Sequence, residues 1–296
     1  MRIVSLVPHA TELLYALGLG DSVVGVTHEC DFPAQTAGVA RVTRDLLPAG
    51  LSAGEIDAAV RERTEQGQAI YALDEALLAE LQPDLIVTQA LCPVCAVSYD
   101  DVTAVAQRLE PRPKVIALDP KTFGETMGDI RTVALATDAE EEGVDLVARL
   151  RARVDRIKTA VEDAPARTLV ALEWFDPVFV AGHWTPQVIE LAGGVDLLGF
   201  PGEHSEQVDW DAVRAARPDV LLCIPCGYDG PRALEEAARF AGELRSTGAK
   251  ELVALDAAAY FSRPGPRLVD GLETLAHALH PGRVRDAPGE VHRLAL

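Results

Sequence analysis

Short apolar runs alternate with helical patterns in the first third of the chain. Four runs have the length and composition of buried strands: residues 2–7 (RIVSLV), 22–27 (SVVGVT), 84–89 (DLIVTQ) and 114–118 (KVIAL). Apolar residues recur at helical spacing in three segments between them: 10–18 (ATELLYALG), 73–81 (LDEALLAEL) and 99–109 (YDDVTAVAQRL). This alternation predicts a parallel sheet with crossover helices.

A long charged segment divides the chain. Residues 138–161 (DAEEEGVDLVARLRARVDRIKTAV) have amphipathic helical spacing, and about 24 helical residues span roughly 36 Å. Strand and helix patterns resume after it, and ELQPDLIVTQ in the first half is echoed by AARPDVLLCI in the second. We therefore predict an α/β protein with two Rossmann-like lobes and parallel sheets, divided into an N-terminal lobe (1–137), a linking helix (138–163) and a C-terminal lobe (164–296).

Composition excludes several classes of partner. The chain has 27 basic and 46 acidic residues, a net charge of −19, which argues against nucleic acid because phosphate binding needs clustered Lys and Arg. The charge also disfavours anionic membrane surfaces, and no apolar run approaches the roughly 18 residues of a spanning helix. We expect a monomer that binds neither nucleic acid nor membrane.

The N-terminal residues and the cysteines bear on the compartment. One basic residue precedes an apolar run of about six, which is short for a signal-peptide core, and Cys30 lies far from a lipoprotein-type start. Read from Met1, the chain is expected in the cytoplasm. Five cysteines in a reducing compartment make permanent disulfides an unfavourable interpretation.

Residues 2–33, RIVSLVPHATELLYALGLGDSVVGVTHECDFP, closely resemble the opening of cobalamin-binding and iron-siderophore-binding proteins of ABC importers. The Ser-Leu-x-Pro-x-x-Thr-Glu segment is the most specific part, and VIELAGGVDLLG (188–199) falls in the family's order. The resemblance covers roughly residues 2–284 and is strongest to the cobalamin binders through GVTHECDFP. It implies two α/β lobes joined by one rigid helix, as in class III periplasmic binding proteins, with a metal chelate bound in the cleft between the lobes.

The resemblance also implies a permease partner. Family members present one exposed glutamate on each lobe, in the helix before each Pro-Asp strand, to dock onto permease arginines. The nearest candidates in this chain are Glu75 and Asp211, and neither occupies the expected position. We therefore expect that this protein does not dock onto an ABC permease in the conventional way.

Candidate ligand-binding residues follow the predicted strands. Ligands of open α/β sheets bind beyond the carboxyl ends of the strands, and aromatic faces with a few polar groups suit a largely apolar macrocycle such as a corrin. The candidates are His9, Glu29, Gln89, Glu173, Trp174, Phe175, His183, Trp184, Tyr228, Tyr260 and Phe261. An alternative for Trp174 and Phe175 is simple core packing at a strand end.

Candidate metal ligands follow the same strands. Thiolate and imidazole side chains suit zinc, copper(I), iron clusters or a chelated cobalt. The candidates are His28, Cys30, Cys92, Cys95 and Cys226. Three alternatives stay open: reduced thiols without a ligand, a hydrogen-bonded loop histidine, and a redox pair in the CxxC of residues 92–95. Cys223 lies inside an apolar run and is expected in the core.

No signature of an enzyme was found. The sequence lacks GxSxG, a Walker loop and GxGxxG after a strand. The leading hypothesis is a non-catalytic binding protein for cobalamin or a related corrinoid, with a further metal ion at the cysteine and histidine residues as an added possibility. The alternatives are a ferric-siderophore or haem binder and, from another class, a cytosolic metalloprotein or enzyme that holds a metal or cluster with these cysteines.

Overall fold

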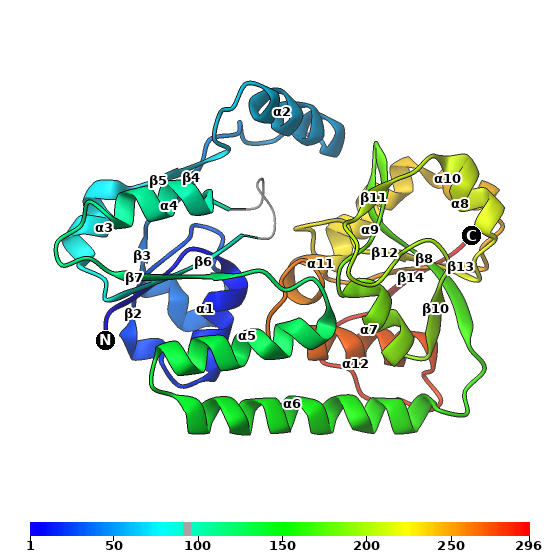
Figure 1. Cartoon of the computed structure of the whole chain (residues 1–296). Coiled ribbons are helices and arrows are strands. Elements are labelled where there is room, and N and C mark those ends of the chain that lie inside the picture. The colour runs from blue at the N-terminus through cyan, green and yellow to red at the C-terminus, as the bar shows by residue number, and fades with distance from the viewer. Residues whose placement is uncertain (91–95) are drawn as a thin grey trace. The chain divides into compact units, whose positions relative to one another are not determined.

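The computed structural model describes residues 1–90 and 96–296 and divides into two compact units (Figure 1). Each unit has its own sheet and its own covering helices, so each is described separately. Unit 1 comprises residues 1–120 and 127–146, and unit 2 comprises residues 121–126 and 147–296.

Helices α5 (Phe123–Ala136) and α6 (Glu140–Val161) each contribute residues to both units. Within unit 1 they pack closely, because a side chain at Gly143 would place its Cβ 2.7 Å from the Cβ of Ala134. Only glycine allows that approach. Within the described ranges, no helix is both long and apolar enough to cross a membrane.

The sheet of unit 1 is parallel throughout, as the alternation of strand and helix patterns predicts. Its strands lie in the order β3-β2-β1-β6-β7, and every neighbouring pair is parallel. The strand bounds are Ile3–Ser5 (β1), Val23–Val26 (β2), Ala40–Arg41 (β3), Leu85–Gln89 (β6) and Lys114–Leu118 (β7).

Helices cover both faces of this sheet (Figure 1). On one face, Leu78 of α3 and Val102 and Val105 of α4 pack with Val4 and Ile86 of the strands into one buried cluster. Burial of these apolar side chains stabilises the layer by roughly 1.5–3 kcal/mol for each. The helix and turn bounds are Pro8–Ala16 (α1), Gly20–Ser22 (η1), Ala34–Gly38 (η2), Glu75–Leu81 (α3) and Tyr99–Ala106 (α4).

A polar excursion leaves the sheet of unit 1 between β3 and α3. It consists of β4 (Thr43–Asp45), α2 (Ala53–Glu65) and β5 (Tyr71–Leu73), and the two strands form an antiparallel ribbon. A capping box of Ser52 and Glu55 starts α2. No element was predicted here from the sequence, because α2 buries only Ala53 fully and so lacks a strong apolar stripe.

The sheet of unit 2 is mixed. Its order is β11-β9-β8-β12-β13-β14, with β10 paired to β8. The neighbours β10, β8, β12 and β13 are parallel, whereas β9, β11 and β14 run antiparallel to their neighbours. The bounds are Arg167–Phe175 (β8), Val178–Val180 (β9), Gly194–Asp196 (β10), Glu206–Gln207 (β11), Val220–Cys223 (β12), Glu251–Ala254 (β13) and His292–Ala295 (β14).

The antiparallel strands refine the predicted architecture. The α/β fold class is confirmed, and parallel pairing holds throughout unit 1 and at the centre of unit 2. The expectation of purely parallel sheets does not extend to the edges of unit 2. Only two residues separate the end of β8 at Phe175 from the start of β9 at Val178, and a two-residue connection joins antiparallel strands alone.

Helix α12 and the unit 2 part of α6 are held together by charge. Arg153 donates to Glu273 at 3.0 and 2.6 Å and to Asp270 at 2.5 Å, and Arg156 donates to Glu273 at 2.8 Å. The remaining helices of unit 2 cover its sheet. Their bounds are Thr185–Leu191 (α7), Trp210–Ala216 (α8), Gly230–Arg239 (α9), Ala241–Ser246 (α10), Ala257–Tyr260 (α11) and Leu268–Leu279 (α12).

Candidate functional site

The carboxyl ends of β1, β2 and β6 meet at one edge of the unit 1 sheet, here called the β1–β2–β6 edge. Ser5 of β1 pairs with Val26 of β2 and with Val87 of β6, so the three strands end nearly level. Parallel strands therefore bring residues far apart in the sequence to one edge. At or just after these strand ends lie His9, His28, Glu29 and Gln89.

His28 is half-buried and is anchored by the excursion. Its ring Nδ1 lies 2.8 Å from Oγ1 of Thr43, and its backbone N–H donates to the same oxygen at 3.0 Å. The hydroxyl of Thr27 lies 2.8 Å from that oxygen as well. Because Thr43 begins β4, the ribbon that carries α2 also orients the imidazole.

The surroundings of His28 favour the neutral form of its ring. Burial lowers the pKa of His28, Asp45 opposes that effect and Arg41 reinforces it. The ring of Tyr71 lies beside it, with centroids 5.4 Å apart and planes tilted by 46°. A neutral imidazole next to an aromatic ring suits contact with an uncharged, partly apolar ligand.

Cys30 and His9 lie in the interior of unit 1. Cys30 is 2% exposed, and its Sγ lies 3.0 Å from Oγ1 of Thr11, which donates to Oγ of Ser5 at 2.8 Å. His9 is 3% exposed in the first turn of α1. This degree of burial indicates packing for both side chains, and the thiol of Cys30 is hydrogen-bonded as well.

Only part of the predicted metal site lies among the residues that the structure describes. Cys92 and Cys95 lie outside the described residues, and Cys226 is exposed in unit 2. Within residues 1–90 and 96–296, no three His, Cys, Asp or Glu side chains gather so that they could hold a metal ion. Cys223 is fully buried, as its apolar strand predicts, and burial raises the pKa of its thiol. The cluster that involves Cys92 and Cys95 stays a prediction.

Gln89 ends β6 with a buried amide that lacks a hydrogen-bond acceptor. Its side chain is 8% exposed, and its Nε2 has no partner among the residues that the structure describes. An unsatisfied buried donor costs about 1–3 kcal/mol, so such a group calls for an explanation. Glu29, on the neighbouring strand end, is half-buried.

A second edge with the same topology lies in unit 2, here called the β8–β12–β13 edge. Leu172 of β8 pairs with Cys223 of β12, and Cys223 pairs with Ala254 of β13. The parallel pairing of the three strands thus ends at one level, and β8 continues to Phe175. At or after these ends lie Glu173, Trp174, Phe175, Cys226, Tyr228, Tyr260 and Phe261.

Three of the candidate aromatic residues belong to the interior of unit 2. Phe175 is 1% exposed and stacks on Phe240, with centroids 5.4 Å apart. Trp184 is 6% exposed, and its Nε1–H donates to the backbone carbonyl of Phe261 at 2.8 Å. Phe261 is itself 3% exposed. For Phe175 the packing alternative considered above fits this environment.

Two tyrosines at the second edge have an arginine beside the ring. The guanidinium of Arg232 lies 3.7 Å from the ring centroid of Tyr228, and that of Arg267 lies 5.1 Å from the ring centroid of Tyr260. Trp174 meets Tyr228 edge to face at 5.6 Å, and its buried Nε1–H has no acceptor in the described part of the chain. This edge therefore also contains an unsatisfied donor.

Glu173 lies at this edge, whereas His183 follows β9, and the two side chains differ in their contacts. Burial raises the pKa of Glu173, and a hydrogen bond with Ser205 opposes that effect. His183 has a φ of +52°, and its Nε2 lies 3.1 Å from Nδ1 of His204. Its backbone N–H donates to the carbonyl of Glu203 at 2.6 Å, which holds the loop in that conformation.

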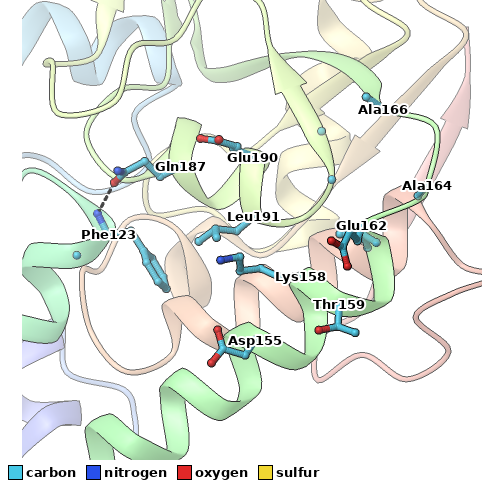
Figure 2. A pocket seen from close by; sticks show the side chains of 14 residues that line it. Phe123, Asp155, Lys158, Thr159, Glu162, Ala164, Ala166, Gln187, Glu190 and Leu191 are labelled. Atoms are coloured by element: carbon cyan, nitrogen blue, oxygen red, sulfur yellow. Dashed lines mark hydrogen bonds between the residues drawn. The ribbon is translucent and has the colours of Figure 1, made fainter.

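A cavity of about 860 Å³ opens at the opposite edge of unit 2 (Figure 2). It is lined by the start of α5, the end of α6 and α7, together with Ala166 and Gly194 at the amino ends of β8 and β10. The backbone N–H of Phe123 donates to Oε1 of Gln187 at 2.7 Å at its border. Sequence reasoning did not anticipate this cavity, because it looked only at the carboxyl ends of strands.

Sequence reasoning also missed residues at the two carboxyl edges. Thr43 and Tyr71 belong to the unanticipated ribbon, and Arg232 lies in the first turn of α9. The apolar run at residues 69–73 (AIYAL) was the available signal for β5, whereas residues 42–45 (VTRD) show no strand pattern. For Arg232 no sequence pattern distinguishes it from other surface arginines.

Comparison with known sequences matches most of the chain. Residues 3–259 match the family described as periplasmic binding protein. The vitamin B12-binding protein of Vibrio cholerae is 24% identical over 274 residues, which cover 92% of this chain and 86% of that protein. An uncharacterized ABC transporter substrate-binding lipoprotein of Bacillus subtilis is 23% identical and covers 96% of this chain and 82% of its own length.

Solved structures of similar proteins share the fold. The periplasmic vitamin B12 binding protein of Vibrio cholerae has a TM-score of 0.65 at 22% identity, covering 94% of this chain and 96% of that one. A periplasmic heme-binding protein from Roseiflexus has a TM-score of 0.68 at 22% identity, with coverages of 95% and 98%. At these identities the likeness concerns the fold.

Proposed function

Because this chain belongs to the periplasmic binding protein family, we propose that it binds cobalamin or a related corrinoid at the carboxyl edge of a sheet. The similarity to vitamin B12-binding proteins along 92% of the chain supports this ligand class. In this proposal the protein holds a small-molecule metal chelate and catalyses nothing.

The observation that supports this ligand most directly is a pair of buried donors without acceptors. Nε2 of Gln89 lies at the β1–β2–β6 edge, and Nε1 of Trp174 lies at the β8–β12–β13 edge. Buried donors in native proteins are almost always hydrogen-bonded, so a ligand rich in acceptors at either edge would account for the donor found there. A corrin offers such acceptors in its carboxamide side chains, and its flat ring suits an aromatic face such as that of Tyr71 at the first edge or that of Trp174 at the second.

Haem or a ferric siderophore is the second candidate. Arg232 beside Tyr228 and Arg267 beside Tyr260 offer cationic groups suited to the carboxylates of such ligands. The fold shared with a heme-binding protein fits this candidate equally well.

Titration calorimetry of the purified protein with cyanocobalamin, dicyanocobinamide, hemin and a ferric hydroxamate tests the proposal. We expect binding of one or both corrinoids below about 1 μM and at least tenfold weaker binding of the other two ligands. Tighter binding of hemin or the hydroxamate would replace the corrinoid with the second candidate. Failure of all four ligands to bind would refute the proposed function.

We further propose that docking to a permease, if it occurs, does not rely on Glu75 and Asp211. Glu75 forms an ion pair with Arg108 at 2.6 Å, and Asp211 pairs with Arg214. Each carboxylate is therefore already engaged by an arginine of this chain, which a permease arginine would have to displace. The test is a permease ATPase assay with Glu75→Lys and Asp211→Lys: stimulation lost in either variant would contradict the proposal, and cell fractionation would locate the protein.

A further inference from the structure

The hydrogen bonds around His28 determine which ring nitrogen carries the proton. A hydroxyl has one hydrogen and two lone pairs, and a neutral imidazole has one donor and one acceptor. Oγ1 of Thr43 accepts the backbone N–H of His28 at 3.0 Å. One lone pair and one hydrogen of Thr43 therefore remain for its two other neighbours, the hydroxyl of Thr27 and Nδ1 of His28, each at 2.8 Å.

Two arrangements fit these contacts. In the first, Thr27 donates to Thr43, Thr43 donates to Nδ1, and the ring proton lies on Nε2. In the second, Nδ1–H donates to Thr43, Thr43 donates to Thr27, and the hydrogen of Thr27 has no acceptor among the residues that the structure describes. The first arrangement makes one more hydrogen bond, which favours it by about fivefold.

His28 thus offers an N–H donor at Nε2, for which residues 1–90 and 96–296 contain no acceptor. Gln89 offers a second donor at the same edge. β1 separates β2 from β6, and adjacent strands lie about 4.8 Å apart, so the two strand ends are roughly 10 Å apart. That spacing allows both donors to reach the rim of one macrocycle.

The charges around His28 favour an uncharged acceptor. Asp45 and Arg41 act on the ring in opposite directions, and the effect of Asp45 is the larger, so the local charge does not favour an anionic acceptor. The amide of Gln89 is neutral as well. A carboxylate would gain little extra at such an edge, whereas a carboxamide oxygen needs only a neutral donor.

From these observations the geometry points to one specific role, which rests on the proposed function. We propose that Nε2–H of His28 and the amide of Gln89 donate to uncharged carboxamide oxygens on the periphery of a corrinoid. His28 is then a specificity-determining residue that distinguishes amides from carboxylates, and it does not coordinate the central metal ion.

The tautomer is tested first, without any ligand. Long-range ¹H–¹⁵N correlation spectra of protein labelled with ¹⁵N-histidine distinguish a proton on Nε2 from one on Nδ1. We expect the Nε2–H form for His28 at pH 8. A predominant Nδ1–H form would overturn the proposal.

The specificity is tested with two corrinoids that differ only in peripheral charge and amide content. Dicyanocobinamide carries carboxamides and dicyanocobyrinic acid carries carboxylates, and cyanide occupies both axial positions of cobalt in each. We expect wild-type protein to prefer the amide form by at least about tenfold, and His28→Phe and Gln89→Leu each to lose most of that preference. His292→Phe, in β14 of unit 2, is the matched control and should retain the wild-type preference.

The outcomes separate the two proposals. If wild-type protein binds both corrinoids equally, or if neither variant changes the preference, the role of His28 and Gln89 is refuted and corrinoid binding stands. A spectral shift of aquocobinamide that wild type produces and His28→Phe abolishes would reveal metal coordination and overturn the proposal too. If wild type binds neither corrinoid, the proposed function itself fails. Gln89→Leu keeps the test valid should His28→Phe not fold.

Discussion

The two carboxyl edges share a topology and differ in chemistry. The β1–β2–β6 edge is built from hydroxyls and an imidazole, with Thr27, Thr43 and His28 in one hydrogen-bonded group. The β8–β12–β13 edge is built from aromatic rings, and Phe175 continues into the core of unit 2. Equivalent positions after parallel strands therefore hold a hydrogen-bonded polar group in one unit and packed aromatic rings in the other.

The largest expected effect tests the packing role of the second edge. Phe175→Ala removes a ring that is 1% exposed and stacks on Phe240, so unfolding free energy should fall by about 4 kcal/mol in urea denaturation. Phe200→Ala is the control, because Phe200 is 62% exposed and its loss should change stability by less than about 0.5 kcal/mol. Similar values for both variants would contradict the assignment.

The next effect tests the polar role of the first edge. Thr43→Val removes the oxygen that accepts the backbone N–H of His28 and bonds the hydroxyl of Thr27, so unfolding free energy should fall by about 2 kcal/mol. The nitrogen spectra of His28 should change as well. Thr132→Val, on the exposed face of α5, should leave both readouts unchanged. An unchanged histidine spectrum in Thr43→Val would show that Thr43 does not set the tautomer.

A smaller, pH-dependent effect is expected at Glu173. Burial raises the pKa of Glu173, so its contribution to stability is full below the unfolded-state value and falls as pH rises through the folded-state value. Glu173→Gln should therefore match wild type near about pH 4 and be more stable than wild type at pH 8.

The control for Glu173 is Glu125, whose pKa is shifted in the opposite direction. The backbone N–H groups of Lys121 and Thr122 lower the pKa of Glu125, so Glu125→Gln should be less stable than wild type at pH 8 and should match it at low pH. Thermal unfolding at the two pH values measures both variants. The same sign of pH dependence in both would refute the difference in burial.

The smallest effect on stability is expected at Trp174. Trp174→Phe removes an unsatisfied indole N–H, which stabilises, and also part of a packed ring, which destabilises, so stability should change by less than about 0.5 kcal/mol while corrinoid affinity falls. Trp184→Phe is the matched control: its N–H donates to Phe261, so its loss should lower stability by about 1–2 kcal/mol. Loss of stability without loss of affinity in Trp174→Phe would refute a binding role.

The sequence predicts the positions of residues better than the directions of their side chains. Apolar runs locate β1, β2, β6 and β7 because buried parallel strands need continuous apolar residues. The same reasoning brings His28 and Gln89 to one edge. It does not reveal that Cys30, only two residues after His28, turns inward to Thr11, because turn geometry sets that direction.

The ribbon and α2 were not predictable from periodicity for a different reason. Their stability depends on contacts distant in sequence, such as Leu46 N–H donating to the carbonyl of Ile70 at 2.9 Å. α2 shows mostly polar or half-exposed residues, which resemble a loop in the sequence. The anchor of His28 was therefore missed, although His28 itself was singled out.

The excursion between β3 and α3 behaves as an exchangeable module. Its two ends are fastened side by side, since the backbone N–H of Asp74 donates to the carbonyl of Val42 at 2.8 Å. Residues between them can be lengthened, shortened or replaced at little entropic cost to the sheet. Thr43 is the first residue of β4, at the start of this module. Such an exchange would therefore change the hydrogen bonds of the His28 imidazole without altering a residue of the five-stranded sheet. This is a route by which ligand preference diverges during evolution.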